Sequence, residues 1–324
     1  MARILFIAKR SPQQRDLATR PYGRFHYLPA TLAGLGHDVR VLLCSHTGRE
    51  EVRLVRFQVE WSTHDIRLSG PGAWYSTLIQ QARDFRPDLV YGLSDAWYGW
   101  LAARLARACG VPHAVDAYDD YESYMPWNLP LHAAWRRAIR DACLATAAGP
   151  QLAAHMDRHR RPGTRPVDTV PMAADPGFTR GARDAARLRL GLPVDAPLVS
   201  YSGAWAKRRG TDLLAEVFSR VGNSIPGVRF VLTGTPPVEV SRRDDVIAVG
   251  YLADAAMPDV LRASNVACVM TADTRFGRSS YPSKLYEAMA CGIPVVATRT
   301  PPVEWILRHE PRSLAGVGDA PAIS

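Results

Sequence analysis

The segment 280–298 (SYPSKLYEAMACGIPVVAT) limits the possible folds more than any other part of the chain. Pro282 suits the first position of a helix, because that position needs no backbone N–H donor. Gly292 falls where a left-handed C-terminal cap would close this helix, and Pro294 prevents the helix from continuing. The apolar residues 295–297 then read as a short strand that is buried on both faces. A helix followed directly by a buried strand is typical of α/β folds.

The same segment carries a pair of opposite charges. Lys284 and Glu287 are three residues apart, so they share one face of the expected helix near its N-terminus. Free N–H groups and a partial positive charge make that end of a helix a seat for a phosphate group. An ordinary salt bridge on a surface helix explains the pair equally well. The segment alone does not decide between these interpretations.

The rest of the chain alternates between strands and helices. In the first half we expect strands at 3–8, 39–44, 51–59, 89–91, 111–115 and 144–148, and helices at 28–35, 73–85, 97–109, 131–142 and 150–156. In the second half we expect strands at 198–201, 228–233, 246–249 and 266–270, and helices at 211–221 and 255–263.

A polar run with proline and glycine, residues 158–165, separates the two halves and is typical of a linker. The alternation on both sides predicts two Rossmann-like, doubly wound α/β domains, 1–165 and 166–324. Ligands bind at the carboxyl ends of the strands in such sheets, and two facing domains form a cleft for a small molecule. No GxGxxG motif follows the first strand, so a nicotinamide-dependent dehydrogenase is not supported.

Composition restricts the class of protein. The apolar share of 47% and the charged share of 22% are those of a globular protein. No apolar run approaches the roughly 20 residues that span a bilayer. The apolar run at 4–8 is too short for a signal peptide, and no small-residue cleavage site follows it. These features predict a cytoplasmic protein.

The formal net charge of +9 favours anionic partners. The basic residues are spread along the chain, with dense groups only at 158–161 and 207–209, and no nucleic-acid-binding motif accompanies them. A nucleic-acid partner is therefore not expected. The amphipathic helix at 131–142 carries several arginines. It is either a solvated face or a contact to an acidic membrane surface, with Trp135 at the interface.

Cysteine and histidine positions argue against a metal centre. The five cysteines are scattered without a CxxC pair, and most have apolar neighbours, so buried free thiols are expected. His155 and His159 have the i,i+4 spacing of a ligand pair, but they lack the glutamate of an HExxH motif and any obvious third ligand. A zinc site is not expected there.

Five segments, taken together, resemble the family-four glycosyltransferases, which are retaining enzymes of the GT-B fold. The resemblance is carried by 280–285 (SYPSKL) before Glu287, 20–25 (RPYGRF) with 35–39 (LGHDV), 170–175 (VPMAAD) with Phe178, 201–203 (YSG) with 207–210 (KRRG), and 249–252 (VGYL). The second domain holds the most specific of these motifs. The resemblance implies an N-terminal acceptor-side domain and a C-terminal domain that binds a nucleotide-sugar donor.

The resemblance also implies roles for particular residues. Glu287 would accept hydrogen bonds from the ribose hydroxyls of the donor. N–H groups around Ser283, Lys284 and Leu285 would hold the diphosphate. Lys207 and Arg209 would neutralise the charge on the leaving nucleoside diphosphate, so that no metal or other cofactor is needed. The remaining donor-side residues implied are Gly23, Gly203 and Tyr251.

Simpler interpretations stand beside these roles. The basic run at 207–209 also fits a solvated turn, and Gly203 fits a tight turn. Asp119 would line the acceptor side, or it would cap the following segment together with Asp120. Asp95 fits the N-cap of the helix at 97–109.

The sequence departs from the family pattern at several positions. The first glutamate of the family motif, which touches the transferred sugar, is replaced by Ser279. The basic residue after the glycine of the phosphate turn is Ala204, and a first-domain histidine is replaced by Tyr118. Residues 316–319 resemble the start of a segment that the family continues into closing helices, which are missing from this sequence.

The leading hypothesis is a retaining glycosyltransferase that moves a sugar from a nucleoside-diphosphate donor to an acceptor hydroxyl. Two alternatives are a non-catalytic nucleotide-sugar-binding subunit, which the serine at 279 favours, and a GT-B sugar epimerase. The base, the sugar and the acceptor are not identified by the sequence. A peripheral contact with the inner membrane face is a further possibility of the basic helix.

Overall fold

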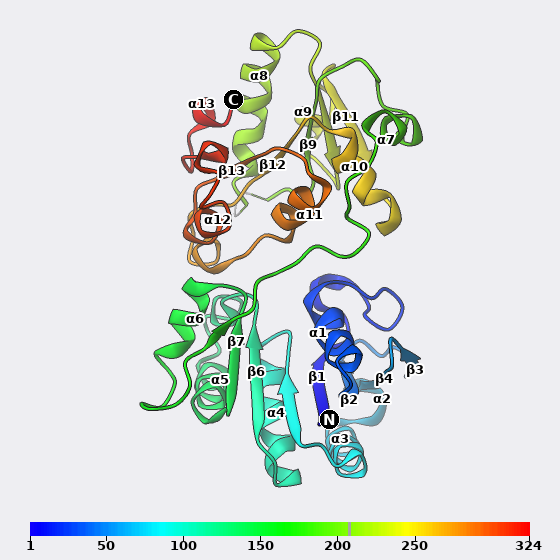
Figure 1. The fold of residues 1–324 in the computed structure, drawn as a ribbon, viewed down its shortest axis with the longest axis vertical. Coiled ribbons are helices and arrows are strands. Elements are labelled where there is room, and N and C mark those ends of the chain that lie inside the picture. Colours follow the sequence, from blue (N-terminus) through cyan, green and yellow to red (C-terminus); the bar gives the residue numbers. More distant parts are fainter. Residues whose placement is uncertain (207–208) are drawn as a thin grey trace. The chain divides into compact units, whose positions relative to one another are not determined.

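A computed structural model gives the fold of the chain, and it describes residues 1–206 and 209–324. The chain divides into two compact units, Met1–Met172 and Ala173–Ser324. The boundary predicted from the sequence, between 165 and 166, falls shortly before this division. Each unit holds one sheet with helices along it (Figure 1).

The first unit contains an eight-stranded sheet in the order β3-β4-β2-β1-β5-β6-β7-β8. All neighbouring strands are parallel except β3 and β4. The strands are β1 (Arg3–Lys9), β2 (Asp38–Ser45), β3 (Arg53–Arg56), β4 (Val59–Asp65), β5 (Leu89–Gly92), β6 (His113–Ala117), β7 (Leu144–Ala147) and β8 (Asp168–Thr169). The helices are α1 (Gly23–Gly34), α2 (Ile66–Ser69), α3 (Pro71–Phe85), α4 (Ala96–Cys109), α5 (Leu129–Asp141) and α6 (Pro150–Asp157).

The second unit, as far as it is described, contains a six-stranded parallel sheet in the order β11-β10-β9-β12-β13-β14. Its strands are β9 (Leu198–Tyr201), β10 (Arg229–Thr233), β11 (Val246–Gly250), β12 (Val266–Val269), β13 (Val295–Thr298) and β14 (Leu314–Ala315). Its helices are α7 (Arg183–Leu190), α8 (Leu214–Ser224), α9 (Val238–Ser241), α10 (Met257–Ala263), α11 (Ser283–Cys291), α12 (Pro301–Ile306) and α13 (Ala320–Ile323).

Both faces of the second sheet are covered, because successive residues of a strand point to opposite sides. On β12, Cys268 packs in one core with Phe218 of α8, while Val269 packs in another core with Leu285 of α11. The rings of Phe218 and Phe230 stack at 4.1 Å within the first of these cores. This two-sided burial confirms the predicted doubly wound α/β class.

The predicted half-buried strand at 51–59 is confirmed only over Arg53–Arg56, because the chain turns into a hairpin after it. β3 ends at Arg56, and β4 returns antiparallel from Val59. The two turn residues, Phe57 and Gln58, have φ values of 50° and 60°. Hairpin turns with positive φ usually carry glycine or asparagine, so the sequence contained no signal for this turn.

The helix expected at 28–35 begins earlier, at Gly23, and this places Pro29 inside α1 rather than in its first turn. The buried residues of the helix include Phe25 and His26. The His26 ring stacks on Trp61 at 5.1 Å, and neither ring nitrogen has a hydrogen-bond partner among the described residues. Burial and the nearby charge of Arg56 lower the pKa of His26 to about 4.

Trp135 of α5 is not at an interface, contrary to the membrane interpretation of the sequence. Its side chain is buried, and its ring lies where a side chain on Gly99 of α4 would be. The exposed apolar residues near this helix are instead Trp127 and Leu129, at 75% and 68% exposure. Among the described helices, none combines the length and apolar character needed to cross a bilayer.

Candidate functional site

The α11 helix forms largely as its sequence predicts. Pro282 is the N-cap rather than the first helical residue, and the helix begins at Ser283. Gly292 closes it in the left-handed conformation, with φ 71° and ψ 28°, and β13 follows as expected. The helix therefore starts beyond the carboxyl end of β12, where doubly wound sheets bind ligands.

Lys284 and Glu287 lie together on the first turns of α11. The Lys284 Nζ is 3.1 Å from the Glu287 Oε2, and the two side chains are 30% and 12% exposed. The Leu285 N–H already donates to the Pro282 carbonyl at 3.0 Å, and the Leu285 side chain is buried in the core. The N–H groups of Ser283 and Lys284 belong to the first turn, where a helix has no internal acceptors for them.

The turn after β9 packs closely against its surroundings. A side chain on Gly203 would lie 3.0 Å from the Tyr201 hydroxyl. Gly234, which follows β10, has φ 78°, and a side chain there would lie 3.2 Å from the Gly203 carbonyl oxygen. The loops after these two neighbouring strands therefore approach each other at their backbones.

Arg209 is the part of the basic turn that the structure describes, because Lys207 lies outside the described residues. The Arg209 N–H donates to the Ala206 carbonyl at 2.8 Å. Its guanidinium lies over the ring of Phe276, 5.4 Å from the centroid, in the loop after β12. The turn after β9 thus contacts the loop that leads to α11, and sequence reasoning did not anticipate Phe276.

Ser279, where the family pattern has an acid, ends a tight loop. Its N–H donates to the Phe276 carbonyl at 3.1 Å. A side chain on Gly277 would lie 2.0 Å from the Ala272 carbonyl oxygen, so the loop needs glycine there. Arg278 forms an ion pair with Asp273 across this loop, at 2.6 Å. No acidic side chain takes the place of the missing glutamate at position 279 itself.

Tyr251, a predicted donor-side residue, and Ser202, which was not predicted, have different surroundings. Tyr251 follows β11 and is 86% exposed, so its ring is available to a planar ligand. The Ser202 hydroxyl, next to Gly203, is buried and has no hydrogen-bond partner among the described residues. A buried polar atom without a partner is rare in folded proteins. Only the tertiary structure marks this serine as a candidate.

Gly23 begins α1 in the first unit with φ 58°. The next residue, Arg24, is buried and forms a two-pronged ion pair with Asp116 of β6, with distances of 2.7 and 2.5 Å. A further N–H of Arg24 donates to the Val170 carbonyl at 2.6 Å. Thr146 of β7 donates to Asp116. Arg24 therefore fixes the start of α1, including Gly23, against the sheet.

Asp119 lies in the segment after β6 and is 7% exposed. It accepts a hydrogen bond of 2.5 Å from the Tyr124 hydroxyl, whereas Asp120 caps the following turn by accepting from the Glu122 N–H. The capping interpretation thus applies to Asp120. Asp95 also caps a helix, since it accepts from the Trp97 N–H at 2.9 Å.

Tyr118 occupies the place of the family's histidine, at the end of β6. Its ring packs edge-on against Phe25 of α1, with centroids 4.9 Å apart. Burial, and then the neighbouring Asp119 charge, raise the pKa of the Tyr118 hydroxyl. The position therefore holds a neutral phenol at physiological pH instead of a titrating imidazole.

Glu122 is a buried carboxylate that the sequence did not single out. It is 2% exposed, and both of its oxygens accept hydrogen bonds from Arg136 of α5, at 2.7 and 2.5 Å. Burial raises its pKa, but the hydrogen bonds and charge of Arg136 outweigh burial, so the pKa of Glu122 is lowered. The group is therefore ionised at neutral pH.

Family models match both halves of the chain. A model described as "Glycosyl transferase 4-like domain" matches residues 24–173, and one described as "Glycosyl transferases group 1" matches residues 196–324. The 2-deoxystreptamine N-acetyl-D-glucosaminyltransferase of Streptomyces fradiae is 26% identical over 255 residues, which is 69% of this chain and 58% of that relative. The chain matches only part of its curated relatives. For three of them, including the Streptomyces enzyme, the match covers between 35% and 61% of the relative's length.

Solved structures share the fold. Sucrose-phosphate synthase from Thermosynechococcus elongatus has a TM-score of 0.72 at 18% identity, covering 100% of this chain and 88% of that one. Anabaena Alr3699/HepE in complex with UDP-glucose has a TM-score of 0.71 at 15% identity, covering 99% and 87%. The chain therefore belongs to the glycosyltransferases of the GT-B fold, and the resemblance to family four in its motifs is confirmed.

Proposed function

We propose that the protein transfers a sugar, with retention of its anomeric configuration, from a nucleoside-diphosphate sugar to an acceptor hydroxyl. The observation that carries the proposal is the Lys284–Glu287 pair on the first turns of α11. An ammonium group and a carboxylate meet there beside the N–H groups of the first helical turn. The UDP-glucose complex of the structurally similar Anabaena protein supports a nucleotide-sugar donor.

Each donor-side residue has a role in this proposal. Glu287 accepts hydrogen bonds from the ribose hydroxyls, and the N–H groups of Ser283 and Lys284 bind the diphosphate. Leu285 supports the helix through its buried side chain more than through its own N–H, which is already bonded. The exposed Tyr251 ring stacks on the base.

The leaving nucleoside diphosphate is stabilised by cations of the turn after β9. Lys207 and Arg209 neutralise the charge that develops as the glycosidic bond breaks. Without a side chain, Gly203 would let the phosphates approach its backbone, and Gly23 is the donor-side residue proposed in the first unit. We propose that these cations replace a divalent metal at the donor, so EDTA should leave donor binding unchanged.

The test is a screen of nucleotide sugars with the full chain, first for binding and then for turnover. Thermal-shift measurements with several UDP-, GDP- and ADP-sugars identify the donor. Release of the nucleoside diphosphate, with and without candidate acceptor alcohols, then measures transfer. We expect acceptor-dependent release and an α-linked product from an α-linked donor by NMR. Failure of every nucleotide sugar to bind would reject the proposal.

The same screen distinguishes a second candidate function, a nucleotide-sugar-binding subunit without its own activity. This alternative is favoured by Ser279, because the loop at this position offers no acid to the transferred sugar. It predicts donor binding without turnover until a partner protein is added. An epimerase would alter the donor sugar without any acceptor, and NMR of the recovered donor detects this.

We propose that Asp119 belongs to the acceptor side. We also propose that the protein is located in the cytoplasm and makes a peripheral contact with the inner membrane face. The exposed Trp127 and Leu129 precede the basic face of α5, which includes Arg137 at 68% side-chain exposure. Aromatic and apolar residues beside arginines suit an acidic lipid surface. The wild type should therefore sediment with phosphatidylglycerol vesicles, whereas W127A/L129A should stay in the supernatant. Neutral vesicles are the control.

A further inference from the structure

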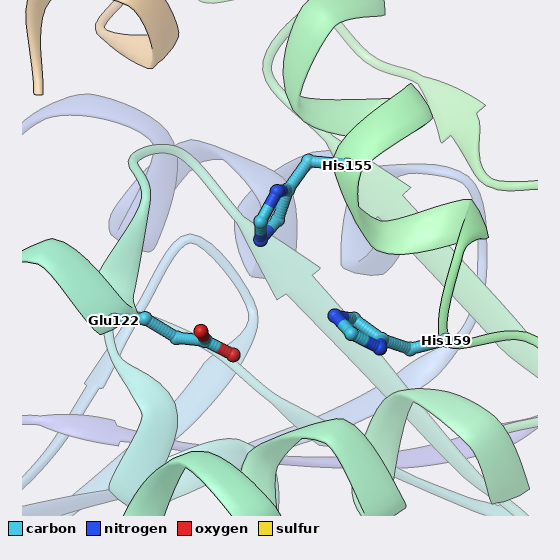
Figure 2. A group of neighbouring side chains, drawn as sticks. All are labelled: Glu122, His155 and His159. Carbon is cyan, nitrogen blue, oxygen red and sulfur yellow. The ribbon is translucent and has the colours of Figure 1, made fainter. Parts of the chain in front are cut away.

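Three side chains that are far apart in the sequence come together in the first unit. Glu122 belongs to the short 3-10 turn Tyr121–Ser123 after β6, His155 lies on α6, and His159 follows that helix. One ligand-type atom of each side chain lies within 4.8 Å of the other two. Figure 2 shows the carboxylate and one nitrogen of each ring directed toward a common space.

The ligand set is that of a zinc ion. Zinc binds imidazole nitrogens and carboxylate oxygens, and with three protein ligands it completes a tetrahedron with water. The two imidazole rings are already arranged edge-to-face, with centroids 5.8 Å apart. Ligand atoms around a zinc ion are roughly 3.4 Å from one another, given bonds of about 2.1 Å. The three groups would therefore need to move by only about 1 Å.

The carboxylate is held in place before any ion arrives. Arg136 donates hydrogen bonds to both oxygens of Glu122, and the Glu122 N–H donates to Asp120. Carboxylate ligands of metals are commonly fixed by such hydrogen bonds from outside the coordination sphere. An ionised carboxylate has about four lone-pair sites, so the group can in principle accept from Arg136 and also bind an ion.

Cationic groups near the cluster oppose a metal ion and set its affinity. These are the guanidinium of Arg136 and that of Arg158, which donates to the His155 Nδ1 at 2.6 Å. The His132 ring is also close, with its Nδ1 3.9 Å from a Glu122 oxygen. Since Arg158 only donates, the neutral His155 ring carries its proton on Nε2. Zinc binding at Nε2 would require the ring proton to be on Nδ1 instead, and Arg158, which is exposed, would then have to leave Nδ1.

We propose that Glu122, His155 and His159 form a Zn²⁺ site that joins the segment after β6 to the end of α6. The same segment carries Asp119, so the ion would restrain the residue assigned to the acceptor side. All three ligands of the proposed site belong to the first unit. Its test needs no sugar transfer, so it stands or falls independently of the proposed function.

The experiment uses the untagged full chain with the C143S change, because Cys143 is an exposed thiol that would bind zinc by itself. Titration with ZnCl₂ by calorimetry gives stoichiometry and affinity, and Co²⁺ reports the geometry by its visible absorption. We expect one ion per chain, Co²⁺ bands typical of four-coordination, and a higher melting temperature with zinc.

Variants then locate the site. H155A and H159A should each weaken zinc binding by more than about tenfold, since each removes a direct ligand. R158A should tighten binding, because it removes a competing donor and a positive charge. H309A, at an exposed histidine of the second unit, is the matched control and should bind as the parent does.

Absence of zinc binding by the parent chain, or equal binding by the H155A/H159A double variant, would overturn the proposal. Circular dichroism and melting without metal show whether each variant folds. E122Q keeps the shape of the side chain and should also weaken binding. If E122Q unfolds because Arg136 loses its partner, the two histidine variants still decide the question.

Discussion

The two units hold their charged groups by different means. In the second unit, Lys284 and Glu287 are three residues apart on one helix, and both remain partly exposed. In the first unit, Arg24 and Asp116 are 92 residues apart, and both side chains are almost completely buried. The local pair is available to a ligand and contributes little to stability. The distant pair is shielded from solvent. Removing one partner leaves the other charge buried and unpaired, which lowers the free energy of unfolding.

The largest effect should come from breaking the distant pair. R24M leaves Asp116 buried without its main partner, which should lower the free energy of unfolding by about 3–5 kcal/mol. Urea denaturation monitored by circular dichroism measures this change. The control is R3M, which removes an ion pair with Asp38 whose side chains are 39% and 48% exposed. R3M should lower the free energy of unfolding by no more than about 1 kcal/mol. An equal loss in R24M and R3M would contradict the difference between the buried and the exposed pair.

Breaking the local pair should affect function and leave the fold intact. E287A removes the proposed acceptor for the ribose hydroxyls, and we expect kcat/KM to fall about a hundredfold, or about 2.7 kcal/mol. Its unfolding free energy should change by less than about 1 kcal/mol. E304A, which removes an exposed pair with Arg299, is the matched control and should keep full activity. Unchanged donor binding in E287A would remove this glutamate from the proposed site.

The buried His26 makes the first unit sensitive to acid. Its folded pKa of about 4 is below the unfolded value of about 6.5, so the unfolded chain binds the proton more readily. The contribution of His26 to the free energy of unfolding is therefore fully present above pH 6.5, and it is lost as the pH drops toward 4. Between pH 7 and 4.5 this residue should contribute a loss of about 2.5 kcal/mol.

The variant H26F isolates that contribution, because phenylalanine keeps the stack on Trp61 and does not titrate. Unfolding free energies of both proteins should be compared at pH 7 and at pH 4.5. The wild type should lose more stability than H26F, since all other titrating groups are shared. Identical losses would show that folding does not lower the pKa of His26.

The smallest effect is expected at two helix ends whose closing glycines have the same backbone conformation. Gly110 closes α4 and Gly292 closes α11, both with φ 71° and ψ 28°. Alanine at either position should cost about 1 kcal/mol from backbone strain. A side chain at 292 would also come within 2.9 Å of Arg180, whereas nothing lies within 4 Å at 110. Thermal melting of G110A and G292A should show a slightly larger loss for G292A.

The sequence predicted the second-unit helix and its charge pair well because its signals are local. Gly292, Pro294 and the spacing of Lys284 from Glu287 each act within one turn of helix. The hairpin at Phe57 and Gln58 was missed because both turn residues lack the usual glycine. The membrane interpretation of Trp135 failed because Gly99 on another helix provides the space that buries its ring.

Local chemistry in the sequence thus determined the α/β class, the ends of α11 and the glycosyltransferase motifs. The tertiary structure alone brought Arg24 to Asp116, buried the Ser202 hydroxyl and placed Glu122 beside His155 and His159. The physical reason is distance along the chain. Helix caps and i,i+3 pairs act between neighbours in sequence, whereas a third ligand or a buried counter-ion is chosen by how distant strands and helices pack.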